Sequence, residues 1–386
     1  NIGFGAYDRD YSFFMDEGVM NDGTKTKGKY GKAVSKENVL KNTNGSIEIL
    51  KSVNADFMML EEVDTKSTRS YKVNQYEMIT STFNNYSISY ASNFHSGYLP
   101  YPLNDMHGIV NSGLLTMSRF NMKESKRIEL PVETKFPTKF FDLDRCLNLI
   151  RYKVGEKDLV MITAHLSAYD EGGVYRQKQL LLLNELMSEE YSKGNYVIVG
   201  GDFNHDLVNS YERGLFKSEQ QLPEWLQILN NDDLSSGFSI IADDKSPSCR
   251  DADIPYEQGV VFTSVVDGFI ASNNIDVKDE NSQLTLGGNF IYSSIKEAEG
   301  LSDVVKYGEI NFTKEEEEVE VVETLADKIT GYAKSGIMSI IYVLAIYGIL
   351  VLIAPKYKER MGKDIKEKGI VDFAIGLLSW IIGMII

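Results

Sequence analysis

Polar side chains recur at the ends of several strand-like segments of this sequence. They are carboxylates, carboxamides and one imidazole: Asn1, Glu62, His165, Asp202, Asn204 and Asp267. Taken singly, a strand-end aspartate is most simply a cap or turn residue, and a lone histidine is most simply structural. Taken together, carboxylate and amide oxygens suit a hard cation, and the imidazole can donate a proton. The joint pattern therefore favours metal-assisted chemistry over a series of unrelated turns.

The densest of these clusters follows the apolar run in VIVGGDFNHDL, residues 197–207. Its two glycines, Gly200 and Gly201, are expected to let the backbone approach a ligand closely, because neither carries a Cβ. Asp202 and Asn204 flank Phe203. Strand alternation predicts both polar side chains on one side and the phenyl ring in the core.

The elements that must position these groups are mixed strands and helices over residues 1 to about 277. Six apolar, turn-bounded runs predict strands: ADFMMLEEV, GIVNSGLLTM, CLNLIRYKV, DLVMITAHL, YVIVGGDF and VVFTSVVDGFIAS. VYRQKQLLLLNELMSEEYS has leucines at helical spacing and predicts a helix. SKENVLKNTNGSIEILKSV predicts a weaker helix, interrupted at Asn44-Gly45. In open α/β architectures such strand ends present functional groups on a rigid platform.

Composition narrows the class of protein. The chain has 386 residues, of which 43% are hydrophobic and 25% charged, which is typical of a protein with a real core. A formal net charge of -16 argues against a nucleic-acid coat protein, which needs clustered Lys and Arg. A divalent cation can still join an acidic protein to a phosphate. Only Cys146 and Cys249 are present, so we expect neither a disulfide scaffold, nor a cysteine zinc site, nor a disulfide-linked partner.

The chain changes character after residue 277. Residues 278–333 carry short β-like segments and the acidic run EEEEVEVVE, which is interpreted as a linker. In residues 334–386, the 18-residue stretch 337–354 has no charge, and a basic loop separates it from a second apolar stretch. This pattern predicts two transmembrane helices with a cytoplasmic loop, and hence a membrane protein whose N-terminal domain is extracytoplasmic. The alternative is a pair of buried core helices.

Several motifs resemble the endonuclease/exonuclease/phosphatase family, the deoxyribonuclease I-like phosphoesterases. The matching stretches are NIGFGAYD, LEEVD, HGIVNSGLLTMSRF, TAHLSAYD, GGDFNHD and VDGFI, and they cover about residues 1–277. The resemblance implies a four-layer α/β/β/α sandwich. It also implies a divalent-metal-dependent hydrolase of phosphoester bonds, a phosphodiesterase, nuclease or phosphatase. Its substrate would be a nucleic acid, a nucleotide or a phospholipid headgroup.

The resemblance also implies roles for individual residues. Glu62 would bind the metal, Mg²⁺ or Mn²⁺, and Asn1 would help to place the metal or the phosphate. His165 would donate a hydrogen bond to a phosphate oxygen, Asp202 would orient or deprotonate the attacking water, and Asn204 would hold water and phosphate. These roles suit the chemistry, because phosphoryl transfer needs charge neutralisation and a positioned nucleophile. Further substrate contacts are assigned to Arg69, Tyr71 and Asn111.

The resemblance fails at the closing Ser-Asp-His motif of the family. Asp267 would normally orient that histidine, but no histidine follows residue 205. In LSDVVKYGEINF, Asp303 matches the metal-binding aspartate and Val304 stands in place of the histidine. Valine can neither donate nor accept a proton.

Two interpretations follow from this departure. The protein is either a catalytically impaired phosphate-binding or membrane scaffold relative, or a chain that leaves the family near residue 278. In the second case, residues 285–386 resemble a membrane-attached bactofilin-like protein. The chain opens on Asn1 without an initiator Met or a signal peptide, so we expect a fragment or a processed chain.

Overall fold

The structure is a computed structural model that describes residues 1–132, 144–168, 171–278 and 294–298. The chain divides into two compact units, Asn1–Phe312 and Thr313–Ile386, and every described residue belongs to the first unit. The predicted membrane segments, the acidic run and Asp303 lie outside the described residues. Within the described ranges, no helix is long and apolar enough to cross a membrane.

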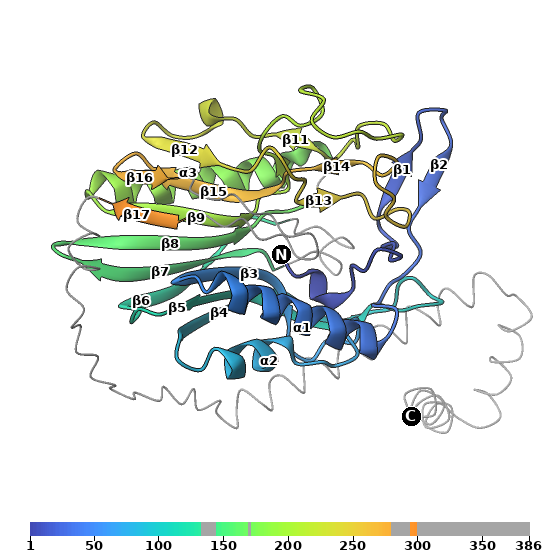
Figure 1. The fold of residues 1–386 in the computed structure, drawn as a ribbon, viewed down its shortest axis with the longest axis horizontal. Helices are drawn as coiled ribbons and strands as arrows, with labels where there is room; N and C mark the ends of the chain where they lie inside the picture. The colour runs from blue at the N-terminus through green and yellow to red at the C-terminus, as the bar shows by residue number, and fades with distance from the viewer. Residues whose placement is uncertain (133–143, 169–170, 279–293, 299–386) are drawn as a thin grey trace, which may run out of the picture. The chain divides into compact units, whose positions relative to one another are not determined.

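Two sheets form the centre of the first unit (Figure 1). The larger sheet has the order β12-β15-β9-β8-β7-β6, and the smaller has the order β3-β5-β4. The large sheet comprises β6 (Glu124–Glu129), β7 (Cys146–Val154), β8 (Lys157–His165), β9 (Tyr196–Asp202), β12 (Phe238–Ile241) and β15 (Asp267–Ser272). The small sheet comprises β3 (Phe57–Asp64), β4 (Ser87–Leu99) and β5 (Gly108–Ser118). In these two sheets, β8 and β9 pair in parallel and the other pairs are antiparallel.

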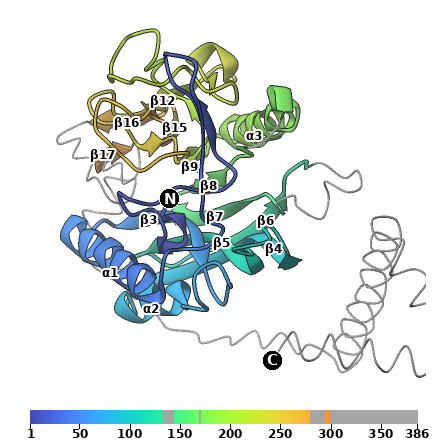
Figure 2. The ribbon, with the colours of Figure 1, turned by 90° about the vertical axis from the view of Figure 1, so that its right-hand side faces the viewer.

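Helices cover the outer face of each sheet, as the two views in Figures 1 and 2 show. Helices α1 (Lys36–Val53) and α2 (Gln75–Thr82) share a buried apolar cluster with β3 and β5. Helix α3 (Val174–Ser192) shares another with β7, β8 and β9. A third cluster joins the inner faces of the two sheets. The protein therefore has the α/β/β/α layering that the sequence predicts.

Short elements surround this sandwich at its edges. In the described ranges, the 3₁₀ helices are η1 (Gly3–Gly5), η3 (Glu171–Gly173) and η4 (Asn231–Asp233). The two-stranded pairs are β1 (Glu17–Val19) with β2 (Lys25–Lys27), β10 (His205–Asp206) with β11 (Gln227–Ile228), β13 (Cys249–Arg250) with β14 (Thr263–Ser264), and β16 (Ile275–Lys278) with β17 (Ser294–Ala298). The last pair connects the chain beyond residue 277 to the sandwich domain.

Helix α1 continues through Asn44-Gly45, so the predicted interruption is wrong. The hydroxyl of Ser35 caps its first turn by accepting a hydrogen bond from the backbone N–H of Asn38 at 3.2 Å. Asn54 ends the helix in the left-handed region, with φ of 54°. Both Asn44 and Gly45 lie on the exposed side, where a glycine lowers helix stability without removing a core contact.

Candidate active site

The ends of β8, β9 and β15 bring three of the predicted residues to one edge of the large sheet. The parallel register pairs His165 with Asp202, and the antiparallel register pairs Asp202 with Asp267. Nε2 of His165 lies 3.7 Å from Oδ2 of Asp202. All three side chains are buried, so their charges act on one another in a poorly hydrated environment.

Asn1 joins this edge to the small sheet. Its side-chain Nδ2 donates to Oδ2 of Asp202 at 3.0 Å and lies 3.4 Å from Oε1 of Glu62, which also accepts from it. The amide is fixed because its Oδ1 accepts a hydrogen bond from the backbone N–H of Gly3 at 2.9 Å. Carboxylates from two different sheets thus converge on one amide group.

A β-bulge directs Glu62 toward this point. The register of β3 on β5 shifts between Leu60 and Val63, and Glu62 has φ of 54°. A bulge re-aims side chains, and a left-handed backbone is uncommon for a residue other than glycine and recurs at functional sites. The bulge gives the adjacent acids Glu61 and Glu62 different environments, because Glu61 is buried and Glu62 is half-buried.

Asn204 is positioned differently from the prediction. Strand β9 ends at Asp202, and Asn204 has φ of 48°, so simple strand alternation does not apply. Its backbone N–H donates to Oδ1 of Asp202 at 2.9 Å, and its side-chain Nδ2 donates to the carbonyl of Leu166 at 2.7 Å. Arg176 on α3 donates through Nη1 to the Asn204 carbonyl at 2.7 Å. Phe203 is in the core, as predicted.

The two glycines before Asp202 are required by protein packing rather than by a ligand. A Cβ on Gly200 would lie 2.6 Å from Sδ of Met59 in the facing sheet. A Cβ on Gly201 would lie 1.9 Å from the carbonyl oxygen of Ala164, and Gly201 has φ of 143°. Tight contact within and between the sheets therefore explains the glycine pair.

His165 is neutral in the folded protein. Burial lowers its pKa well below the usual value, and the positive charge of Arg145 lowers it further. Nδ1 of His165 has no hydrogen-bond partner within the part of the chain that the structure describes. A neutral imidazole carries one N–H, which suits the predicted role as a hydrogen-bond donor to a phosphate oxygen.

Burial and mutual repulsion disfavour the charged forms of two acids at the site. Burial raises the pKa of Asp267 well above its usual value, and repulsion from Asp202 raises it further. Burial also raises the pKa of Glu61. Among the described residues, both Oδ atoms of Asp267 and Oε1 of Glu61 find no hydrogen-bond partner, although the N-terminal ammonium of Asn1 lies 3.8 Å from Oδ1 of Asp267 and 2.9 Å from Oε2 of Glu61. Such orphaned oxygens fit a place where a cation would stabilise the charged form.

The donor set suits a cation that takes few protein ligands. Among the described residues, no group of three or more His, Cys, Asp or Glu side chains forms a metal site by itself. Mg²⁺ commonly uses one or two carboxylates and completes its shell with water and substrate phosphate. Glu62 meets that smaller requirement, and Asn1 positions it by donating from Nδ2, while Oδ1 of Asn1 accepts from Gly3. Asp303, the other predicted metal ligand, lies outside the described residues.

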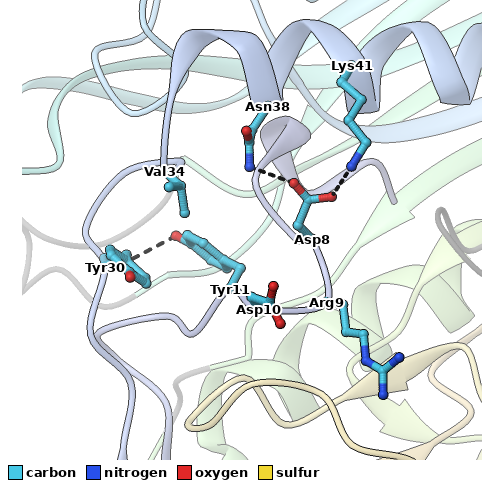
Figure 3. Close-up of a pocket in the computed structure, with 8 residues that line it drawn as sticks. All are labelled: Asp8, Arg9, Asp10, Tyr11, Tyr30, Val34, Asn38 and Lys41. Carbon is cyan, nitrogen blue, oxygen red and sulfur yellow. Dashed lines mark hydrogen bonds and ion pairs between the residues drawn. The ribbon is translucent and has the colours of Figure 1, made fainter.

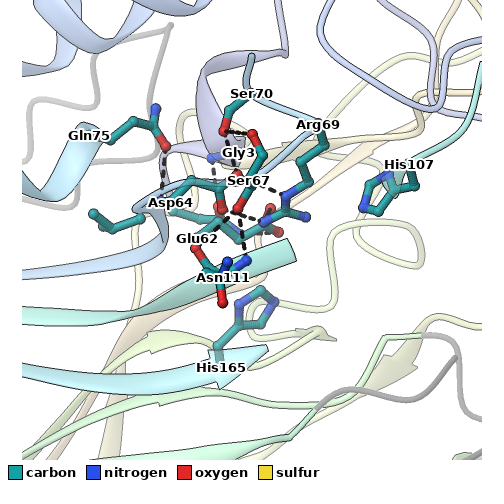
Figure 4. A network of polar contacts seen from close by, with 12 residues as sticks. Gly3, Glu62, Asp64, Ser67, Arg69, Ser70, Gln75, His107, Asn111 and His165 are labelled. Atoms are coloured by element: carbon teal, nitrogen blue, oxygen red, sulfur yellow. Dashed lines mark hydrogen bonds and ion pairs between the residues drawn. The ribbon is translucent and has the colours of Figure 1, made fainter. Parts of the chain in front are cut away.

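The predicted substrate residues occupy different surroundings (Figure 4). The Arg69 guanidinium forms two hydrogen bonds with Asp64, at 3.1 and 2.9 Å, and its Nη2 lies 3.7 Å from Oε2 of Glu62. Oδ1 of Asn111 lies 2.8 Å from Nδ1 of His95. The Tyr71 hydroxyl instead donates to the carbonyl of Val34 at 3.3 Å.

Three further residues of the site were not identified from the sequence. Glu61 is adjacent to Glu62 in the same motif, and only the bulge distinguishes their roles. Arg176 lies within the predicted helix and is fully buried against Asn204. Arg145 is also buried, and its charge acts on His165.

A separate pocket of about 380 Å³ lies near the N-terminal loop (Figure 3). It is lined by Asp8, Arg9, Asp10, Tyr11, Tyr30, Val34, Asn38 and Lys41. Asp8 is already bound by Nδ2 of Asn38 at 2.7 Å and by Nζ of Lys41 at 3.1 Å. The pocket contains none of the strand-end residues and is distinct from the candidate active site.

Part of the chain is similar to known proteins. Residues 39–218 match the model of the endonuclease/exonuclease/phosphatase family. Similar solved structures include TDP2 from Caenorhabditis elegans, with 16% identity over 65% of this chain and 64% of that chain and a TM-score of 0.42. The human Nocturnin catalytic domain with bound sulfate is 15% identical over 65% of this chain and 83% of that chain, with a TM-score of 0.41. An endonuclease/exonuclease/phosphatase from Beutenbergia cavernae is 15% identical over 64% of each chain, with a TM-score of 0.45.

The chain spans about 64% of the length of the C. elegans protein. No curated protein matches the chain. The matched segment contains Glu62, His165, Asp202 and Asn204, which the fold brings to one edge. Residues 39–218 of this chain thus match the endonuclease/exonuclease/phosphatase family, in agreement with the resemblance of the sequence motifs.

Proposed function

We propose that the protein hydrolyses phosphoester bonds with the help of a divalent cation, Mg²⁺ or Mn²⁺. Members of its family are phosphoester hydrolases. The observation that carries the proposal is the convergence of Glu62 and Asp202, from different sheets, on the carboxamide of Asn1. Orphaned acid oxygens at the same edge supply a reason for a cation to bind there.

Each residue of the edge has a defined part in this proposal. Glu62 would hold the cation and Asn1 would help to place it; the cation, when bound, neutralises charge developing on the phosphoryl group. Oδ1 of Asp202 accepts from the Asn204 backbone N–H and Oδ2 accepts from Nδ2 of Asn1, and the remaining lone pair of Oδ2 would face the attacking water. His165, being neutral, donates its N–H to a phosphoryl oxygen.

The departure at the end of the family pattern supports a second candidate function. Asp267 has no histidine after it in the sequence, and its oxygens make no hydrogen bond. A protein that binds a cation and phosphate without turnover would fit this feature. For both candidate functions, the substrate or ligand is proposed to be a nucleic acid, a nucleotide or a phospholipid headgroup.

We also propose that the chain is held at a membrane through residues 334–386, with the N-terminal domain extracytoplasmic. The uncharged stretch 337–354 and the basic loop after it support this proposal. Alkaline extraction of membranes, followed by protease digestion of intact cells, tests it. Release into the soluble fraction, or protection of the N-terminal domain from external protease, would count against it.

Metal titration with a simple ester separates the two candidate functions. We expect p-nitrophenyl phosphate or bis(p-nitrophenyl) phosphate to be hydrolysed with Mg²⁺ or Mn²⁺, and turnover to stop with chelator. Calorimetry of the same protein measures cation binding directly. Binding without turnover favours the non-catalytic function, and the absence of both contradicts the two.

A further inference from the structure

The β4–β5 hairpin carries the most exposed apolar side chain of the described residues. Leu103 is 76% exposed, Tyr98 and Tyr101 are each 52% exposed, and Ile109 is 40% exposed. Isolated exposed apolar residues are ordinary, but several on one projecting turn indicate a binding surface.

These exposed residues lie on the same hairpin as Asn111, which is close to the candidate active site. The backbone carbonyl of Asn111 accepts from the N–H of Thr65, three residues after Glu62. His95 is the cross-strand partner of Asn111, and their side chains are 2.8 Å apart. Farther along the hairpin lie Tyr98 and Ile109, and then the turn with Tyr101 and Leu103. The surface thus passes from polar groups at the site to apolar groups at the tip.

The tip is held in place by the preceding loop. Oδ2 of Asp105 accepts from the backbone N–H of Gly31 at 2.9 Å, and Nζ of Lys32 pairs with Oδ1 of Asp105 at 3.0 Å. The Tyr101 ring packs edge-on against Phe14, with centroids 5.5 Å apart. A fixed turn presents its exposed side chains at little conformational cost, which favours binding.

We propose that this hairpin strip docks on a lipid bilayer and that the substrate is a phospholipid whose headgroup enters the site. The strip comprises His95, Tyr98, Tyr101, Leu103, Ile109 and Asn111. The inference rests on the proposed phosphoester hydrolysis and adds the substrate class. A phospholipid has a polar phosphate group and apolar acyl chains. The strip likewise has polar side chains near the site and apolar side chains at its tip.

Charge and side-chain type favour a bilayer over other occupants. Tyrosine side chains suit the membrane interface, where the ring is buried and the hydroxyl stays hydrated. The exposed Lys29 lies in the loop that supports the turn and can meet lipid phosphates. The strip itself contains no Lys or Arg, which disfavours the phosphate backbone of a nucleic acid as its occupant.

A probe at the tip tests docking without requiring turnover. The full chain with Asp202→Ala and Leu103→Cys is labelled with an environment-sensitive fluorophore and mixed with vesicles of phosphatidylcholine and phosphatidylglycerol. The control carries the label at Leu181→Cys, on α3, where the native side chain is 63% exposed. The Asp202→Ala protein without an added cysteine is labelled in parallel, and its fluorescence measures the contribution of the native Cys146 and Cys249. All forms keep residues 334–386, so any general attachment is common to them.

The outcomes separate the occupants. A blue shift at position 103 that is absent at position 181 supports docking of the strip. No shift at 103, or equal shifts at both positions, overturns it. A shift that depends on protein concentration without vesicles indicates a second copy, and a shift with oligonucleotides alone indicates nucleic acid; either result overturns it as well.

Turnover then tests the substrate class. Tyr98→Ser with Leu103→Ser is expected to lower hydrolysis of vesicle phospholipid at least about tenfold, because burying each apolar side chain contributes roughly this factor. Hydrolysis of bis(p-nitrophenyl) phosphate should stay unchanged, as it should in the Leu181→Ser control. Equal loss on both esters, or none on vesicles, contradicts the inference. Failure of the unsubstituted protein on every ester instead contradicts the proposed function.

Discussion

His165 and Asp202 face each other from adjacent parallel strands, with Nε2 of the imidazole 3.7 Å from Oδ2 of the carboxylate. Because burial lowers the pKa of His165 well below its usual value, the two side chains are not an ion pair at neutral pH. Asp202 is instead held by neutral donors, the carboxamide of Asn1 and the backbone N–H of Asn204. A carboxylate held in this way keeps its capacity to accept a proton from water.

The neutral state of His165 leads to a prediction about rate and pH. His165→Gln should lower kcat about 100-fold with little change in KM, because it alters a donor used in the transition state. The pH profile of kcat should keep its shape, since the imidazole does not titrate near its usual pKa. Steady-state kinetics across pH measures both. Loss of an acidic limb near the ordinary histidine pKa in the variant would contradict this account.

Glu62 is predicted to determine cation affinity. Glu62→Gln keeps the size of the side chain but removes its charge, so calorimetry should show Mn²⁺ binding at least about tenfold weaker. Glu48→Gln is a matched control, because Glu48 is an exposed helix residue paired with Lys51. Equal affinities in Glu62→Gln and the unsubstituted protein would remove Glu62 from the cation site.

Arg176 is predicted to be essential for stability and for the position of Asn204. Arg176→Met leaves the carbonyls of Asn204 and Trp225 without their buried donor, which should lower the free energy of unfolding by about 2–5 kcal/mol. Arg213→Met removes an exposed ion pair with Asp244 and should change the free energy of unfolding by less than about 0.5 kcal/mol. Urea unfolding of both variants makes the comparison. Similar values for the two would show that the contact with Asn204 contributes little.

Stability should fall in acid because of buried His107. Burial lowers its pKa from 6.5 to about 4, so the unfolded chain binds its proton first as pH falls. Its contribution is complete above pH 6.5 and is lost progressively toward pH 4, on the order of 3 kcal/mol. Relative to His107→Phe, the free energy of unfolding of the wild type should therefore decrease as the pH is lowered from 7 to 4. A constant difference would contradict a neutral His107.

Much of the fold follows from local sequence patterns. Apolar runs predict β3, β5, β7, β8, β9 and β15, and the leucine spacing predicts α3 over Val174–Ser192, as the structure has it. Strand β4 was missed because SISYASNFHSGYL is rich in serine and glycine and has few apolar positions. Its place in the sheet comes from pairing with β5, which no local pattern contains.

The details of the site depend on tertiary structure for a similar reason. The motif LEEVD cannot distinguish Glu61 from Glu62, because a bulge that forms only on pairing with β5 turns them to different surroundings. In the sequence, the glycines before Asp202 suggest the close approach of a ligand. In the structure, close packing against the facing sheet explains Gly200. Arg176 lies 28 residues before Asn204, a separation at which sequence gives no contact.

The most direct measurement of the central claim is the hydrolysis rate of bis(p-nitrophenyl) phosphate at saturating Mn²⁺, compared between the unsubstituted protein and Asp202→Ala. Asp244→Ala is the matched control, because that aspartate is exposed and pairs with Arg213 away from the strand ends. The account predicts a loss of at least about 100-fold in Asp202→Ala and an unchanged rate in Asp244→Ala. Turnover by the unsubstituted protein that does not exceed that of Asp202→Ala would contradict it.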